Sequence, residues 1–142
     1  MQSSFVYLVQ TDTTVGFLSR DARALSRAKQ RLAGKSYITA VESNKALPRI
    51  PKAHKKRVRR AAATTFIHQN GNSYRVIKGV HNDFVRRFGA VYSTSANKSG
   101  EDFDLAYAKA HCAVIVEDPR GFSPKGASSL VKLGKSKLRR LR

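Results

Sequence analysis

The chain has 142 residues, of which 28 are Lys or Arg and nine are Asp or Glu, so its net charge is +19 at pH 7. This length fits a single domain over residues 1–142, and a hydrophobic fraction of 41% excludes disorder by composition. No run of roughly 18 apolar residues occurs, which excludes a transmembrane helix and predicts no membrane association, and the positive charge predicts a polyanionic partner such as RNA, DNA or a nucleotide.

The first third of the chain predicts two strands separated by a long helix. A buried strand is expected at residues 5–9 ("FVYLV"), followed by the hydroxyl-rich turn "TDTTVGFLS". Residues 19–34 predict a helix with Ser19 as its N-cap and Gly34 at its C-terminal end. The apolar stripe of this helix comprises Ala22, Leu25, Ala28 and Leu32. "SYITAVES", residues 36–43, predicts the second strand.

The rest of the chain predicts further strands alternating with short helices. Residues 44–63 contain Pro48, Pro51 and the basic run "KAHKKRVRR", and Pro51 suits the first turn of a short helix. "TTFIHQ" and "SYRVIKG" predict a hairpin across the turn "NGN". Helices are expected at 81–89, ending at Gly89, and at 101–111, and strands at "AVYST", "CAVIVED", "SSLVKL" and "KLRRLR". This order predicts a single-domain α/β fold with a mixed sheet.

The N-terminal segment and the cysteine content indicate the cellular compartment. "MQSSFVYLVQ" has no basic start and only a five-residue apolar run, which is typical of a strand and not of a signal peptide. The single Cys112 lies in an apolar run, which favours a buried structural thiol over a reactive one. We therefore expect a cytoplasmic protein.

Several kinds of catalytic site have no support in the sequence. The four histidines (His54, His68, His81 and His111) share no metal-ligand spacing, so no metal site made by the protein is expected. No nucleophile elbow, P-loop or dinucleotide fingerprint is present, and Asp102 and Asp104 fit helix-terminal charges better than catalytic acids. A site on this chain would be built from Ser, Thr, Asn, Lys and Arg, with no covalent nucleophile, and such groups suit phosphate chemistry.

Four stretches supply those residue types. They are "TDTTVG" (11–16), "KQRLAGK" (29–35), "VYSTSANKSGE" (91–101) and "KGASSLVKL" (125–133). Taken singly, the first is also typical of an ordinary turn, and the second of a solvated helix face.

Together, and in this order, the stretches resemble the motifs of the YrdC-like domain, the threonylcarbamoyl-AMP synthase family of transfer-RNA modification. "STSANKSG" resembles the family's STSANxSG signature, "KQR" with Lys35 its KxR motif, and "TDTTVG" its P-T-D/E-T-x-Y-G motif. "ASSLVKL" resembles the PST strand, "AATTFI" lies where the family has P-G-P-x-T, and "SYRVI" resembles a strand that holds a family Arg. Gln10, Val15 and residues 61–63 ("AAA") differ from the family's Pro, Tyr and Pro-Gly-Pro.

The resemblance implies an open, twisted sheet with flanking helices and a concave basic cavity. It also implies an activity, in which L-threonine, bicarbonate and ATP give threonylcarbamoyl-AMP and pyrophosphate. ATP with Mg²⁺ would be a substrate, no prosthetic group is expected, and other transfer-RNA modification proteins are candidate partners. By motif, Lys29 and Arg31 would hold phosphates and the substrate carboxylate, and Ser95 and Asn97 the nucleotide phosphate and the threonyl part. Thr11, Lys35, Thr65, Arg75 and Ser129 are further substrate-binding candidates.

Two alternatives remain open. The first is a non-catalytic YrdC-like module that binds double-stranded RNA or transfer RNA through two basic runs, which can also be read as a solvated surface. Its candidate residues are Lys52, Lys55, Lys56, Arg57, Arg59, Arg60, Lys137, Arg139 and Arg140. The second is a carbamoyl-type transferase or a nucleotide hydrolase on the same fold.

Overall fold

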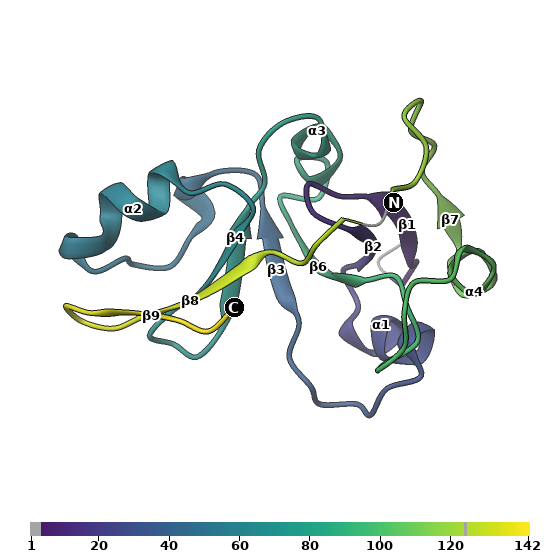
Figure 1. Ribbon diagram of the computed structural model, residues 1–142, viewed down its shortest axis with the longest axis horizontal. Helices are drawn as coiled ribbons and strands as arrows, with labels where there is room; N and C mark the ends of the chain where they lie inside the picture. The colour runs from purple at the N-terminus through teal and green to yellow at the C-terminus, as the bar shows by residue number, and fades with distance from the viewer. Residues whose placement is uncertain (1–3, 124) are drawn as a thin grey trace.

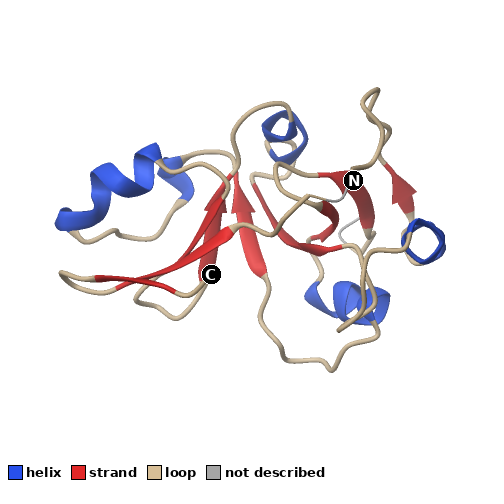
Figure 2. Cartoon of the chain, viewed as in Figure 1, coloured by secondary structure: helices blue, strands red, loops and turns tan. Residues whose placement is uncertain are grey.

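The computed structural model describes residues 4–123 and 125–142, and one mixed sheet runs through them (Figures 1 and 2). Its nine strands lie in the order β7-β1-β2-β6-β3-β5-β4-β8-β9. The strands are β1 (Tyr7–Gln10), β2 (Val15–Ser19), β3 (Ile38–Val41), β4 (Thr64–Ile67), β5 (Ser73–Val76), β6 (Ala90–Ser95), β7 (Val114–Ile115), β8 (Ser129–Leu133) and β9 (Leu138–Arg140). The helices are α1 (Ala22–Lys29), α2 (Lys55–Arg60), α3 (His81–Val85) and α4 (Leu105–Ala110), with 3₁₀ turns η1 (Asn44–Ala46) and η2 (Lys52–His54). The predicted α/β class and mixed sheet are confirmed.

Helices cover both faces of the β1–β2 end of the sheet. On one face, Leu25 of α1 and Ala108 of α4 pack with Leu8, Val15 and Phe17. On the other face, helix α3 and the residues after it pack with the alternate side chains of the same strands, among them Tyr7, Val9 and Leu18. This alternation is the period of two expected for strands buried on both faces.

The far end of the sheet has a separate small core. Val58 of α2 packs with Phe66 of β4 and with Val131 and Leu133 of β8. Pro51 is the N-cap of η2, which leads directly into α2, so the predicted short helix after this proline is confirmed. In Figure 1, α2 and the β8–β9 hairpin form the end of the molecule opposite α1 and α4.

The hairpin at the start of the sheet corrects one sequence prediction. Residues 15–19, expected within a turn, form strand β2, which pairs antiparallel with both β1 and β6. The sequence pattern predicted a turn here because the segment contains Gly16, and glycine is uncommon in strands. It is required here because a Cβ at this position would lie 2.7 Å from Cγ2 of Thr11.

The first helix is shorter than predicted at both ends. Ser19 belongs to β2, and Asp21 is the N-cap, accepting a hydrogen bond from the Arg23 amide at 2.9 Å. The helix ends at Gln30, whose φ of 51° is left-handed, and not at Gly34. Leu32 therefore lies outside the helix and is 80% exposed, so its assignment to the apolar stripe is wrong.

The other predicted elements are present with shifted ends. The hairpin across residues 70–72 forms β4 and β5, and Gly89, at φ 75°, follows α3. Asp104 caps α4 through the amides of Ala106 and Tyr107, as expected for a helix-terminal acid. Cys112 is half-buried, and burial raises the pKa of its thiol. No helix in the described part of the chain is long and apolar enough to cross a membrane.

Candidate functional site

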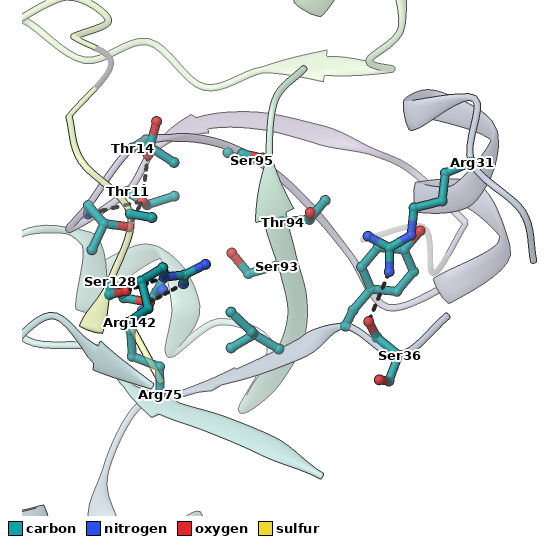
Figure 3. Close-up of a pocket in the computed structure, with 15 residues that line it drawn as sticks. Thr11, Thr14, Arg31, Ser36, Arg75, Ser93, Thr94, Ser95, Ser128 and Arg142 are labelled. Carbon is teal, nitrogen blue, oxygen red and sulfur yellow. Dashed lines mark hydrogen bonds between the residues drawn. The ribbon is translucent and has the colours of Figure 1, made fainter. Parts of the chain in front are cut away.

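A cavity of about 240 Å³ opens where the β1–β2 turn, the ends of β6 and β5 and the segment before β8 meet (Figure 3). Hydroxyl and guanidinium groups dominate its wall. The lining residues are Thr11, Thr13, Thr14, Gly16, Arg31, Ser36, Tyr37, Ile38, Arg75, Ser93, Thr94, Ser95, Ala127, Ser128 and Arg142. The composition of this wall suits an anionic, hydrogen-bonding ligand.

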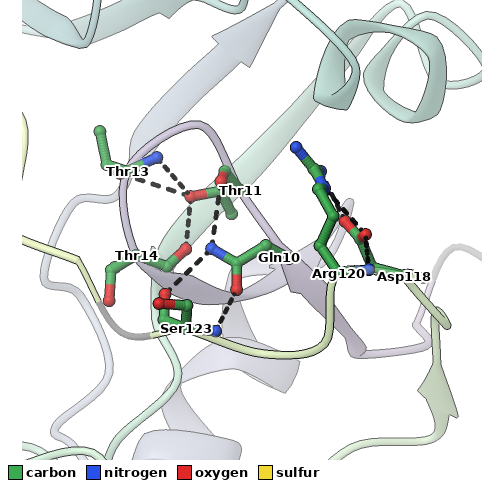
Figure 4. A network of polar contacts seen from close by, with 7 residues as sticks. All are labelled: Gln10, Thr11, Thr13, Thr14, Asp118, Arg120 and Ser123. Carbon is green, nitrogen blue, oxygen red and sulfur yellow. Dashed lines mark hydrogen bonds and ion pairs between the residues drawn. The ribbon is translucent and has the colours of Figure 1, made fainter.

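The threonine-rich turn is held in a fixed shape by its own hydroxyls (Figure 4). The Thr11 amide donates to the Thr14 carbonyl at 3.1 Å, and the Thr13 amide donates to the Thr11 hydroxyl at 3.2 Å. Gln10 ties this turn to a distant loop, since its amide donates to the Ser123 carbonyl at 3.1 Å and its Oε1 accepts from the Ser123 amide at 2.7 Å. The position that differs from the family's proline therefore links the turn to the segment leading to Ser128.

Arg75 and Arg142 lie at one end of the cavity, beside Ser128 (Figure 3). Arg142 donates from Nε to the Ser128 carbonyl at 2.9 Å. Arg75 is 5% exposed and pairs with the Asp12 carboxylate at 3.2 Å. Burial raises the pKa of Asp12, and the positive charge of Arg75 partly opposes that shift. This end of the cavity therefore carries two guanidinium groups, one of which is paired with the Asp12 carboxylate behind the wall.

Arg31 lies at the other end of the cavity. Its guanidinium stacks over the Tyr37 ring at 4.4 Å and donates to the Ser36 carbonyl at 3.0 Å. The stacking holds the planar fork in one orientation, which favours bidentate contact with a carboxylate or phosphate. The cavity is thus positively charged at both ends with hydroxyls between them.

Lys29 is buried beneath the loop that follows β6 and does not line the cavity. Its Nζ donates to the carbonyls of Ser95 and Asn97, each at 3.0 Å. Burial, with a smaller contribution from the charge of Arg31, lowers the pKa of Lys29 to about 8. In this geometry the ammonium group fastens the 95–97 loop to the end of α1.

Lys29→Met is therefore expected to loosen that loop. The carbonyls of Ser95 and Asn97 would lose their charged donor, and a hydrogen bond to a charged group contributes about 1.5–3 kcal/mol. Amide hydrogen exchange at residues 95–99 should accelerate by about tenfold or more, since tenfold corresponds to about 1.4 kcal/mol. Lys35→Met, on the exposed segment nearby, is the matched control; equal exchange in the two variants would contradict the role assigned to Lys29.

The structure brings together four of the nine substrate-binding candidates. Thr11, Arg31, Arg75 and Ser95 line the cavity. Lys35 is exposed outside it, Thr65 is buried below it with its hydroxyl 2.8 Å from that of Ser128, and Ser129 lines a different groove.

Asn97 fixes the loop itself. Its amide nitrogen donates to the carbonyls of Glu101 at 2.7 Å and Lys98 at 2.8 Å.

Sequence reasoning did not select Arg142, Asp12 or Ser128 as site residues. Asp12 and Ser128 lie inside two of the quoted motifs, so their neighbours provided a signal. Arg142 had no such signal, because it lies in the basic run at the end of the chain and outside every motif. Among the described residues, no three His, Cys, Asp or Glu side chains lie together as metal ligands would.

Val15, which stands where the family has Tyr, faces away from the cavity. It is fully buried in the core with α1, whereas its neighbour Gly16 lines the cavity. Side chains at successive strand positions point to opposite faces. The cavity wall at this point is therefore the glycine backbone and not the side chain of residue 15.

No family model and no curated protein matches the sequence. Among solved structures, P. abyssi Sua5 complexed with L-threonine is similar with a TM-score of 0.76 at 15% identity, covering 98% of this chain and 50% of that one. E. coli YciO is similar with a TM-score of 0.72 at 14% identity, covering 97% of this chain and 82% of that one. Full-length HypF in the phosphate- and nucleotide-bound form has a TM-score of 0.72 at 14% identity, covering 98% of this chain and 27% of that one. The chain thus has the YrdC-like fold and spans about half the length of the P. abyssi protein.

Proposed function

We propose that this YrdC-like domain is a threonylcarbamoyl-AMP synthase acting in transfer-RNA modification. The observation that carries the proposal is the cavity with an arginine at one end, two arginines at the other and hydroxyls between them. The two substrates each carry an anionic group, the carboxylate of threonine and the phosphates of ATP. These two groups match the two positively charged ends of the cavity. The threonine complex of the P. abyssi structure supports the same assignment.

The proposed reaction needs no covalent intermediate on the protein. The threonine amine takes up carbon dioxide from bicarbonate to form a carbamate. A carbamate oxygen then attacks the α-phosphate of ATP in line, a new P–O bond forms, and the bond to pyrophosphate breaks. Mg²⁺ on the triphosphate neutralises charge as part of the substrate.

The protein's share of catalysis is orientation and charge neutralisation. Arg31, stacked on Tyr37, would hold the threonine carboxylate, and Arg75 with Arg142 would hold phosphate oxygens. Ser93, Thr94 and Ser95 would donate to the nucleotide from β6. The volume of about 240 Å³ is small beside the roughly 300–1,000 Å³ of common ligand sites, so part of the nucleotide would lie outside the cavity.

Pyrophosphate release from ATP tests this function. It should require both threonine and bicarbonate, and Arg31→Gln should lower the rate at limiting threonine by about tenfold or more, since a hydrogen bond to a charged group contributes about 1.5–3 kcal/mol and tenfold corresponds to about 1.4 kcal/mol. Arg27→Gln is the matched control, because this arginine is exposed on α1, four residues earlier, with only a 3.9 Å pair to Asp21. Its rate should stay within about twofold of wild type.

One outcome would select the non-catalytic alternative. If folded protein binds ATP but releases no pyrophosphate in response to threonine, the synthase assignment fails and a binding module remains. Release without threonine would instead favour a nucleotide hydrolase.

A further inference from the structure

Strand β7 is the edge strand at the end of the sheet opposite α2 (Figure 1). Within the described part of the chain it pairs with β1 alone. The Val114 amide donates to the Val6 carbonyl at 3.2 Å, and the Val116 amide donates to the Leu8 carbonyl at 2.9 Å. In a parallel pair, the residue between two such donors turns its own N–H and C=O away from the partner strand. The backbone of Ile115 therefore faces outward, as the unpaired groups of a sheet edge do.

A hollow lies on each face of the sheet beside this edge. On the face covered by α3, a hollow of about 230 Å³ is lined by Phe84, Val116 and Pro119 among others. On the face covered by α4, a wider hollow of about 600 Å³ is lined by Ile115, Pro119 and Phe122 among others. We call them the α3-face hollow and the α4-face hollow. Both are lined by residues 117–119, the segment directly after β7, so they lie on either side of the same edge.

A strand added along β7 would use the edge and both hollows. Its backbone would pair with the outward N–H and C=O of Ile115, a residue that is 43% exposed. Because successive side chains of a strand point to opposite faces, one side chain would enter the α3-face hollow and the next the α4-face hollow. In peptide recognition by strand addition, main-chain hydrogen bonds give affinity and pockets for alternate side chains give specificity. The edge of β7 has both features.

The charges around the two hollows indicate the kind of partner. Three acids and three bases line them, so they carry no net charge in a chain of net charge +19: Asp83, Glu117, Asp118, Arg87, Lys109 and Arg120. A surface without net charge does not select a polyanion. A second copy of the chain is disfavoured, because two molecules with this net charge repel each other. An extended segment of a different protein, with apolar side chains and little charge, fits this edge.

We propose that β7 is a docking edge, at which an extended and uncharged segment of a partner protein adds one further strand to the sheet. The segment carries apolar residues at two successive positions, one for each hollow. No residue lines both the arginine-lined cavity and either hollow, so docking leaves that cavity open.

A peptide selected on the protein tests the proposal. A phage-displayed library of random peptides of about seven residues, near the usual length of a strand, is selected on the immobilised full chain. The most enriched peptide is then synthesised with a fluorescein label. Ile115→Pro should weaken its binding by about tenfold or more, because proline lacks the outward N–H and its ring obstructs the added strand. The matched control is Ile115→Val, which keeps the N–H and should bind within about twofold of wild type.

A charge in the α3-face hollow tests the side-chain contacts separately. Val80 lines this hollow and is 67% exposed. Val80→Glu should weaken peptide binding by about tenfold, because it removes apolar contact and places a charge where an apolar side chain docks. Leu32→Glu is the matched control, since Leu32 is 80% exposed and lines neither hollow.

Several outcomes would overturn the docking edge. They are a library without an enriched peptide, equal affinity of Ile115→Pro and Ile115→Val, and an Ile115 amide whose hydrogen exchange does not slow when the peptide binds. A dimer in sedimentation equilibrium that Ile115→Pro dissociates would replace the partner protein by a second copy. Thermal melting shows whether Ile115→Pro folds, and Val80→Glu decides the question if it does not. Pyrophosphate release by Val80→Glu should stay at the wild-type rate, which separates a failure here from a failure of the synthase assignment.

Discussion

Arg75→Met is expected to lower the free energy of unfolding by about 3–5 kcal/mol, the usual cost of breaking a buried ion pair from one side. The Arg75 and Asp12 side chains are 5% and 12% exposed and lie 3.2 Å apart. Methionine keeps much of the packing but leaves the Asp12 carboxylate buried without its counter-charge. Urea denaturation at pH 7, with the midpoint and slope fitted together, measures the loss.

A double-mutant cycle separates the lost pair from the lost packing. In the Asp12→Asn, Arg75→Met double variant no buried charge is left at this pair, and it should recover most of the stability lost by Arg75→Met alone. The Arg75→Met defect should also shrink at acidic pH, because burial raises the pKa of Asp12 and protonation removes its charge. Additive losses in the cycle, with no recovery in the double variant, would show that the pair contributes nothing beyond its separate side chains.

The sequence predicted most strands and helices because their signals are local. The turn between β4 and β5, the acid that caps α4 and the proline before η2 each act within a few residues of the element they define. The end of α1 is different. Gln30 takes a left-handed conformation while the preceding Lys29 reaches the Ser95 and Asn97 carbonyls, a contact between residues 66 and 68 positions apart. No local pattern predicts a helix end that is coupled to tertiary contacts of this kind.

The sequence motifs predicted several residues of the candidate site, but not the full set of residues that line the cavity together. Thr11, Arg31 and Ser95 lie in motif stretches that the sheet order brings to one edge, and all three line the cavity. Arg142 lines it because the end of the chain runs back beside β8, where its Nε donates to the Ser128 carbonyl. That placement depends on β8 pairing with β4, a long-range choice that residue spacing does not encode.

The basic runs show the same difference between composition and placement. The sequence grouped Arg139 with Arg140, yet the β8–β9 register separates them by face. Arg140 pairs with Val131, which points toward α2, and Arg139 pairs with Lys132, which points to the other face. The charge of the run was visible in the sequence, but which of its residues share a groove was not.

Acid should destabilise the wild-type fold through His81, and His81→Leu should remove that effect. His81 is 6% exposed, it stacks on Phe84, and neither ring nitrogen has a hydrogen-bond partner among the described residues. Burial, together with the charge of Arg75, lowers the pKa of His81 to about 4 from its usual 6.5. Between these two pH values His81 is protonated in the unfolded chain but stays neutral in the folded protein. The free energy of unfolding therefore falls as the pH drops from 6.5 to 4. The shift corresponds to about 3 kcal/mol at 1.36 kcal/mol per pKa unit.

The comparison that isolates this residue is the difference in unfolding free energy between wild type and His81→Leu across pH 4 to 7. The difference should change by up to about 3 kcal/mol in favour of the variant as the pH falls, because the other titrating groups are shared by both proteins. His111→Gln, on the partly exposed ring that stacks on Tyr107, is the control for the loss of a histidine elsewhere in the chain. Parallel pH profiles for wild type and His81→Leu would mean that the ring is hydrated or charged in the folded protein. Such a result would place water or a counter-charge beside α3, and an NMR titration of the His81 ring would then report a pKa near its ordinary value.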